Sequence, residues 1–306
     1  MTPEPRSQAP ALFAERLLQR LDDFVFLTQK STHAPDVAAA ELARIAGRRL
    51  QEGLETLRPW LGNVLLERAR RLIKKARRLL GPLAEEAILL RRMAHPQASE
   101  AAAFERAREL VLGESTDERA RAHDRVRALR LHRLHAQLGG ALAALLQAPP
   151  DAPHFFLRLA ASLAERKDLL QVGWSLLATQ DTNTNTHRLL IDTTKLLTMC
   201  ESVDQLHVIS CRELIDSLEE AQREMYLCYE LELLDDLLSR VAASADLVRD
   251  RLDLVSALVR MIAELRAERL RHLELARALL DPARVNARLV PALAALKQAA
   301  APATGS

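Results

Sequence analysis

The stretch NVLLERARRLIKKARRLL, residues 63–80, decides the fold class. Its apolar side chains recur every three or four residues, at Leu65, Leu66, Ala69, Leu72, Ile73, Ala76, Leu79 and Leu80. That spacing predicts an amphipathic helix whose apolar face is buried. Gly81-Pro82 interrupts the pattern, and we expect helical structure to continue beyond it to about Met93.

The rest of the chain has the same helical character. Of its 306 residues, 49% are hydrophobic but 3% are aromatic, and nine are glycine. Alanine, leucine, arginine and glutamate dominate and favour helices, whereas β-sandwiches and barrels need β-branched and aromatic residues. Periodicity predicts further helices over 11–27, 37–57, 100–112, 117–147, 154–179, 187–200, 204–238, 244–280 and 285–300. We therefore expect an all-α protein.

The segment QAPPDAP, residues 147–153, is the strongest boundary within the chain. We expect residues 1–10 to form a disordered tail, 11–150 a first helical bundle, 151–300 a second bundle, and 301–306 a tail. Residues 36–150 carry 21 lysines and arginines against 14 acidic residues, a net charge of +7. Residues 151–306 carry 18 against 23, a net charge of −5. This asymmetry indicates an anionic partner for the basic half.

The sequence also predicts a cytoplasmic protein. It contains no run of about 18 apolar residues, so we expect no membrane span. The first ten residues, MTPEPRSQAP, lack the apolar segment of a secretory signal. Cys200, Cys211 and Cys228 are three in number and lack zinc-site spacing, so we expect reduced, buried thiols.

The most concentrated charge lies in ERARRLIKKARRLLG, residues 67–81. Seven basic side chains accompany one acid there: Arg68, Arg70, Arg71, Lys74, Lys75, Arg77 and Arg78. Arg71, Lys74, Lys75 and Arg78 are spaced so that they share one face of the helix, where like charges repel. A bound polyanion would relieve that repulsion by replacing condensed counterions. The alternative interpretation is the solvated face of a basic surface helix.

Two further groups of basic residues suit the same kind of ligand. Arg44 and Arg48 lie one helical turn apart, and the guanidinium fork matches phosphate oxygens. Glu41, one turn earlier, is the alternative partner for Arg44. The segment RAHDRVRALRLHRLHAQ, residues 121–137, is predicted to form another wall of a basic channel, or else a charged surface, through Arg127, Arg130 and Arg133. Two of its histidines are spaced three apart, but no third metal ligand is near, so we expect no metal site.

These residues resemble the CHAD family, the conserved histidine α-helical domain. The first half of that family opens with the pattern HxxRxxxRRLR, which falls here on Glu41, Arg44, Arg48, Arg49, Leu50 and Gln51. The three arginines match, while glutamate replaces the histidine and glutamine the last arginine. A second family pattern, LGxxRDxDV, retains Leu80-Gly81, with Glu85 in place of the first aspartate.

The second half of the family opens with HxxRxxxKRLRYxxE. This pattern retains four residues here, namely His187, Lys195, Leu196 and Glu201. Leu190, Thr194 and Leu197 replace basic residues, so the chain resembles a degenerate member of the family. That mixed stripe suggests packing against the other half or against a protein partner. A weak similarity between residues 71–89 and 210–228 also suggests that the two halves are related.

The resemblance implies two pseudo-repeated helical bundles that bind inorganic polyphosphate in a basic channel between them. The residues that it and the charge pattern assign to a polyanion are Arg44, Arg48, Arg49, Arg71, Lys74, Lys75, Arg77, Arg78, Arg127, Arg130, Arg133, His187 and Lys195. The alternative is a scaffold that has lost the ligand and acts through protein–protein contact, for example at a storage granule.

Catalysis and nucleic-acid binding fit the sequence less well. GxGxxG, GxxxxGK[ST], GxSxG and ExxH are all absent, so we expect no enzyme and no cofactor. Two tryptophans, two tyrosines and six phenylalanines offer few platforms for base stacking, so single-stranded nucleic acid is not an expected partner.

Overall fold

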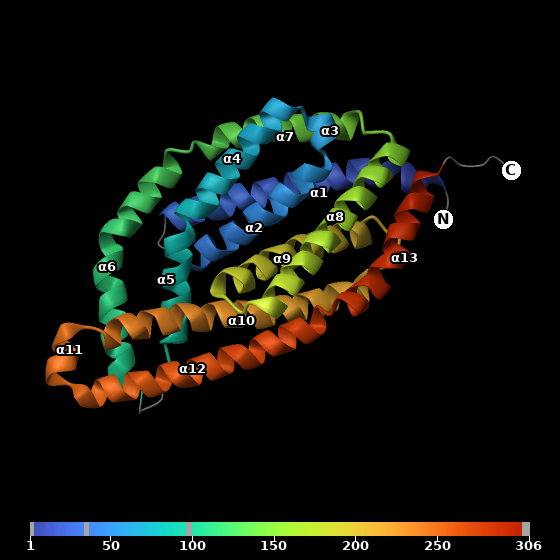
Figure 1. The fold of residues 1–306 in the computed structure, drawn as a ribbon. Helices are drawn as coiled ribbons and strands as arrows, with labels where there is room; N and C mark the ends of the chain where they lie inside the picture. The colour runs from blue at the N-terminus through green and yellow to red at the C-terminus, as the bar shows by residue number, and fades with distance from the viewer. Residues whose placement is uncertain (1–2, 34–36, 96–99, 302–306) are drawn as a thin grey trace.

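The computed structural model describes residues 3–33, 37–95 and 100–301, and this part of the chain is all-α, with no strand (Figure 1). The all-α prediction is therefore confirmed. The helices are α1 (Pro3–His33), α2 (Val37–Thr56), α3 (Arg58–Leu61), α4 (Asn63–Leu79), α5 (Gly81–Arg92), α6 (Ala101–Arg127), α7 (Leu131–Gln147), α8 (Ala152–Thr179), α9 (Asn183–Gln205), α10 (Arg212–Ala242), α11 (Ala245–Asp250), α12 (Leu252–Leu279) and α13 (Pro282–Ala300).

The largest apolar core joins the two halves of the sequence. Helix α1 packs along α2 and α7, and α8 packs along α9 and α13. Phe13 of α1 meets Phe155 of α8 edge-on, with ring centroids 5.4 Å apart, and both rings are buried. The connection between α7 and α8 lies at residues 148–151, inside the predicted boundary, and Asp151 caps α8. The two halves therefore share a core, and the internal repeat stays a prediction.

Helix α4 is amphipathic, as its sequence predicts. Leu66, Ala69, Ile73 and Ala76 are buried. The helix ends at Leu79, and Pro82 occupies the first turn of α5, where its missing N–H costs no hydrogen bond. α5 continues to Arg92, close to the predicted end at Met93. The basic residues of α4 consequently lie on its opposite face and at its edges.

A second apolar cluster forms where α5 and α6 reach α10 and α12 (Figure 1). Met93 and Phe104 pack there with Leu238 and Leu258, all of which are buried. Helices α5 and α6 thus tie the basic half of the sequence to the acidic half. Among the described residues, no helix is long and apolar enough to cross a membrane.

The predicted N-terminal tail is wrong for residues 3–10, which begin α1. Ala9 is buried and continues the row formed by Phe13 and Leu17, one helical turn at a time. Pro10 within the helix was the misleading signal, because proline usually breaks a helix interior. Residues 1–2 and 302–306, the remainder of the two predicted tails, lie outside the described residues.

Several predicted helices differ in their limits. The helix predicted over 117–147 is two helices, because Arg130 adopts the left-handed conformation (φ 51°, ψ 50°) between α6 and α7. His207, with φ 54°, lies in the turn that separates α9 from α10 inside the predicted helix 204–238. Arg251 separates α11 from α12, and α9 begins at Asn183 inside a predicted loop.

Candidate anion-binding site

Helix α2 presents Arg44 and Arg48 towards the second half of the chain. Both side chains are partly buried and line a cavity of about 30 Å³ together with His187 of α9 and Tyr226 and Tyr229 of α10. The walls of this cavity therefore come from both halves of the sequence. It is the place where the predicted arginines of the first half and the predicted histidine of the second half meet.

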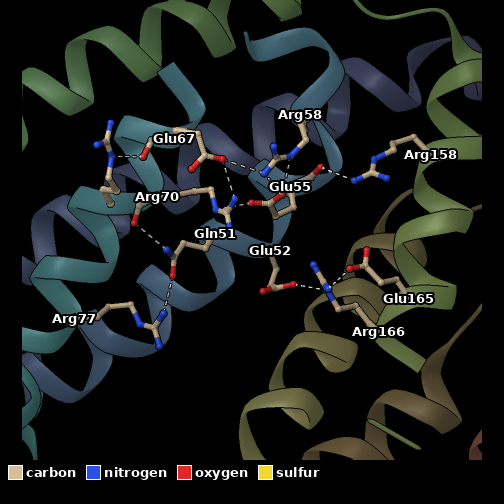
Figure 2. Close-up of polar contacts among 11 residues, drawn as sticks. Gln51, Glu52, Glu55, Arg58, Glu67, Arg70, Arg77, Arg158, Glu165 and Arg166 are labelled. Carbon is tan, nitrogen blue, oxygen red and sulfur yellow. Dashed lines mark hydrogen bonds and ion pairs between the residues drawn. The ribbon is translucent and has the colours of Figure 1, made fainter. Parts of the chain in front are cut away.

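Arg77 enters the same region from α4. Its Nη1 donates a 2.6 Å hydrogen bond to Oε1 of Gln51, and Gln51 in turn donates to the main-chain oxygen of Arg70 at 3.1 Å (Figure 2). The side chain crosses α2 at Gly47, where an added Cβ would lie 3.0 Å from Cγ and Cδ of Arg77. Gly47 and Gln51 together allow Arg77 to reach the arginines of α2.

The three guanidinium groups repel one another in a poorly hydrated place. Burial, followed by the charges of Arg48 and Arg44, lowers the pKa of Arg77 to about 10. Burial is also the main cause that lowers the pKa of Arg48. Nε of Arg48 and Nε of Arg77 are buried and have no hydrogen-bond partner among the described residues. Buried donors of this kind are costly unless a partner accepts from them.

His187 contributes a third unsatisfied group. Its ring centroid lies 5.6 Å from that of Tyr229, and its Nδ1 is buried without a hydrogen-bond partner in the described part of the chain. Burial first, and then Arg48, Arg44 and Arg77, lower the pKa of His187. The imidazole is therefore neutral near pH 7 in the ligand-free protein, and it would gain a proton more readily beside a bound anion.

The two tyrosines close the cavity on the side of α10. The hydroxyl of Tyr229 donates to Oε1 of Glu85 on α5 at 3.0 Å. Burial and then Glu85 raise the pKa of Tyr229 to about 12, and burial raises the pKa of Tyr226. Both phenols stay protonated at physiological pH, so they add no negative charge to the cavity.

The nearest carboxylates are already engaged by other cations. Oε2 of Glu52 accepts from Nε of Arg166 at 2.6 Å, and both side chains are largely buried (Figure 2). Asp192 accepts from Nζ of Lys195 at 2.9 Å. The alternative pairing of Glu41 with Arg44 is not formed; Glu41 bonds to Arg91 instead, at 3.3 Å.

Arg44, Arg48 and Arg77 consequently have no carboxylate partner among the described residues. Glu41 lines the same cavity, and the charges of Glu52 and Asp192 reach Arg48, but each of these carboxylates is bonded to another cation. We call these three arginines with His187 the central cluster. Its net charge of about three and its unfilled donors are the properties of a site for an anion.

Arg70, two helical turns before Arg77, shows the contrast. It pairs with Glu55 at 2.7 Å and with Glu67 at 3.0 Å, and Arg58 joins the same two acids (Figure 2). This network of ion pairs stabilises the connection between α2 and α4. Because its charges are paired directly, it differs from the central cluster, whose three arginines have no carboxylate bonded to them among the described residues.

The other predicted residues of the basic half lie elsewhere. Four residues of α4 are exposed and make no ion pair with any described residue, namely Arg71, Lys74, Lys75 and Arg78. Arg127, Arg130 and Arg133 are exposed near the junction of α6 and α7, and Arg127 donates to the main-chain oxygen of Thr32 at 2.8 Å. None of these three lines the cavity of the central cluster in the described structure, so their part in a basic channel stays a prediction.

Arg49 faces a second, larger cavity of about 510 Å³ between α1, α2, α9 and α10. It pairs there with Glu201 at 3.0 Å, beside the partly buried Arg20. Four arginines and four acidic residues line this cavity: Arg16, Arg20, Arg49 and Arg212, with Asp23, Glu201, Asp204 and Glu219. The balance of charge makes it a poorer place for a polyanion than the central cluster.

The residues of α9 that stand where the family pattern has basic residues are buried within the protein. Leu190, Thr194 and Leu197 are each no more than 2% exposed. The hydroxyl of Thr194 donates to the main chain one turn earlier, and it accepts from Nε2 of Gln222 on α10 at 2.8 Å. The stripe therefore packs against the protein's own helices, as one of the two sequence interpretations requires, and it offers no surface to a separate partner.

The described chain is all-helical, and its two halves meet at three arginines that have no carboxylate partner among the described residues. Comparison with known proteins gives the family. The family model described as CHAD domain matches residues 15–239, so the chain belongs to the CHAD family. The crystal structure of the CHAD domain from the plant Ricinus communis is similar in fold, with a TM-score of 0.58 and 17% sequence identity over 93% of this chain and 91% of that one. No curated protein matches in sequence.

Sequence reasoning missed Tyr226, Tyr229, Glu52 and Gln51 as parts of the site. A signal for the tyrosines was present, because they are the chain's two tyrosines and lie three residues apart, on one helical face. Nothing local in the sequence marks Glu52 as the partner of Arg166, 114 residues later.

Proposed function

We propose that this CHAD protein binds inorganic polyphosphate, or a similar polyanion, at the central cluster, and that it does so without catalysis. The observation that carries the proposal is the group of three arginines that have no carboxylate partner among the described residues. Phosphate oxygens would accept from Nε of Arg48 and Nε of Arg77, and would offset the repulsion between the guanidinium groups. Membership of the CHAD family, which is associated with polyphosphate, supports this choice of ligand.

The ligand-free cavity has room for about one water molecule, so a phosphate group enters only when side chains move outward. Arg44 and Arg48 are long, and no carboxylate in the described chain fixes them. We therefore expect these two side chains to move away from the cavity and then to bind the ligand. Absence of catalysis is supported by the cysteines, whose pKa values burial raises, which keeps the thiols protonated and poorly nucleophilic.

Isothermal titration with polyphosphate at two salt concentrations tests the proposal. If three charges are neutralised, raising the salt from about 50 to about 200 mM should weaken binding roughly 20- to 40-fold. A double variant, Arg44→Gln with Arg48→Gln, should lose most of the affinity. The matched control is Arg260→Gln with Arg284→Gln, because both are exposed arginines without an ion pair in the described structure. Equal affinities of the two variants would rule out the central cluster.

A scaffold that has lost its ligand is the second candidate. The loss of basic residues at Leu190, Thr194 and Leu197 of α9 favours this candidate, but all three side chains are buried in the protein's own core. The same titration decides between the two functions, because a scaffold predicts no saturable binding of polyphosphate by the unmodified protein at low salt.

A further inference from the structure

The cavity of about 510 Å³ between α1, α2, α9 and α10 is separate from the central cluster, since none of the cluster's four residues lines it. Its volume lies within the range of about 300–1,000 Å³ that is typical of cavities for small organic ligands. Its lining is divided between a charged end and an apolar end, which is the arrangement of a site for an amphipathic molecule.

The charged end forms around Glu201 of α9. Arg20 of α1 and Arg49 of α2 lie 3.9 and 3.0 Å from its carboxylate oxygens. Burial lowers the pKa of Arg20, and the charges of Arg49 and Arg16 lower it further, whereas the charge of Glu201 opposes them. One carboxylate therefore faces three guanidinium groups, and this end of the cavity carries excess positive charge.

The apolar end lies two helical turns away. Leu27 follows Arg20 by seven residues on α1, about 10 Å along the helix. Leu42 precedes Arg49 by the same interval on α2. Leu27 packs against the apolar cluster that includes Ala43 of α2, which places both leucines at the same end. Leu42 is 51% exposed, so an apolar ligand group that covers it would gain from the removal of apolar surface from water.

The remaining charges of the cavity balance in number but do not pair with one another. Arg16 is exposed and makes no ion pair with any described residue. Asp23 of α1 and Glu219 of α10 are also exposed, and neither has an ion pair in the described part of the chain. Asp23 lies one helical turn from Arg20, yet the guanidinium of Arg20 turns towards Glu201. A ligand with one anionic and one cationic group would satisfy both the arginines and the unpaired carboxylates.

Two other charged residues of the lining are already engaged. Arg212 pairs with Asp216 at 3.1 Å. Asp204 accepts from the main-chain N–H of Cys211 at 2.8 Å. The groups available to a ligand are therefore the arginines of α1 and the two unpaired carboxylates.

The spacing of these groups limits the length of the ligand. Arg20 and Asp23 are three residues apart, which is about 4.5 Å along α1. An extended dipeptide separates its carboxylate and its ammonium group by at most about 7 Å, so its two ends can reach both residues at once. The ends of a longer extended peptide would lie too far apart.

We propose that this cavity binds a zwitterionic dipeptide with apolar side chains. Arg16 and Arg20 hold its carboxylate, and Asp23 and Glu219 hold its ammonium group. The side chains of the dipeptide lie against the apolar end of the cavity. The proposal does not depend on the binding of polyphosphate, because the carboxylates that attract an ammonium group repel a polyanion.

Titration calorimetry with the dipeptide Leu-Leu tests the proposal. Three related compounds each remove one feature: N-acetyl-Leu-Leu lacks the ammonium group, Leu-Leu amide lacks the carboxylate, and Gly-Gly lacks the apolar side chains. The variant Arg16→Gln with Asp23→Asn removes one charge of each sign from the cavity. Its matched control, Arg260→Gln with Glu264→Gln, does the same on an exposed face of α12. Circular dichroism establishes that both variants remain helical, and the four compounds decide the question on the unmodified protein if a variant does not.

Leu-Leu should bind the unmodified protein saturably, and each of the three related compounds should bind at least ~10-fold more weakly. The cavity variant should also bind Leu-Leu at least ~10-fold more weakly, whereas the control should bind it normally. Equal binding of N-acetyl-Leu-Leu would show that the site takes an apolar carboxylate, and would overturn the proposal. Absence of Leu-Leu binding, or an equal loss of affinity in the control, would overturn it as well.

Discussion

Replacement of Arg77 by glutamine should stabilise the ligand-free protein and weaken its binding of polyphosphate. The pKa of about 10 lies well below the value of about 12.5 for a solvated arginine, a difference worth about 3 kcal/mol. Because the folded-state pKa is the lower one, the charged form destabilises the fold, and stability rises as pH increases from about 10 towards the unfolded value. Loss of the hydrogen bond to Gln51 offsets about 1 kcal/mol of the gain.

The net gain in free energy of unfolding should therefore be about 1–2 kcal/mol at pH 7, measured by urea denaturation without ligand. Affinity for polyphosphate should fall by about 1.5–3 kcal/mol, the range for a hydrogen bond to a charged group. Arg260→Gln, on an exposed face, should change neither quantity appreciably. A variant at residue 77 that is less stable than the unmodified protein but binds polyphosphate normally would refute the reasoning, because Arg77 would then be a structural residue.

Three further perturbations test the surroundings of the site. Burial and nearby arginines lower the pKa of His187 below that of the unfolded chain, so the free energy of unfolding should fall as pH drops through about 6.5. The variant His187→Gln should reduce this loss, measured by urea titrations at about pH 5.5 and 7.5. An identical pH dependence in the variant would contradict the prediction. Glu52→Gln should lower the free energy of unfolding by about 3 kcal/mol, because it leaves the buried guanidinium of Arg166 without its carboxylate. Unchanged thermal unfolding would show that the ion pair contributes little to stability. Gly53→Ala should be less stable than Gly140→Ala by about 1–3 kcal/mol, because a Cβ at residue 53 would overlap Cδ2 of the buried Leu17 whereas residue 140 faces open space. Equal stabilities would mean that the core accommodates the added methyl group at no cost.

The helical fold could be predicted from the sequence because periodic burial dominates it. The apolar stripe of α4 and the break at Gly81-Pro82 both follow from local chemistry. The breaks at Arg130 and His207 could not be predicted in the same way. Both residues adopt a positive φ without being glycine, the residue type that usually signals this conformation in a sequence.

The candidate site could be predicted in part. Arg44, Arg48 and His187 were assigned from the family pattern, and they do line one cavity. The division of α4 between Arg77, which turns inward, and the basic residues that stay exposed was not predictable. It depends on how α4 lies across α2, and on the space that Gly47 leaves for one side chain. The residues that neutralise competing charges, such as Arg166 for Glu52, come from distant parts of the chain.

A crystal structure of the protein bound to polyphosphate tests the central claim most directly. We expect phosphate oxygens about 2.7–2.9 Å from Nε of Arg48 and Nε of Arg77, the distance of a charge-assisted hydrogen bond. A further oxygen should lie within hydrogen-bond distance of Nδ1 of His187, which has no partner in the ligand-free protein's described residues. Phosphate groups found only in the 510 Å³ cavity beside Arg49, with the central cluster unchanged, would contradict the account.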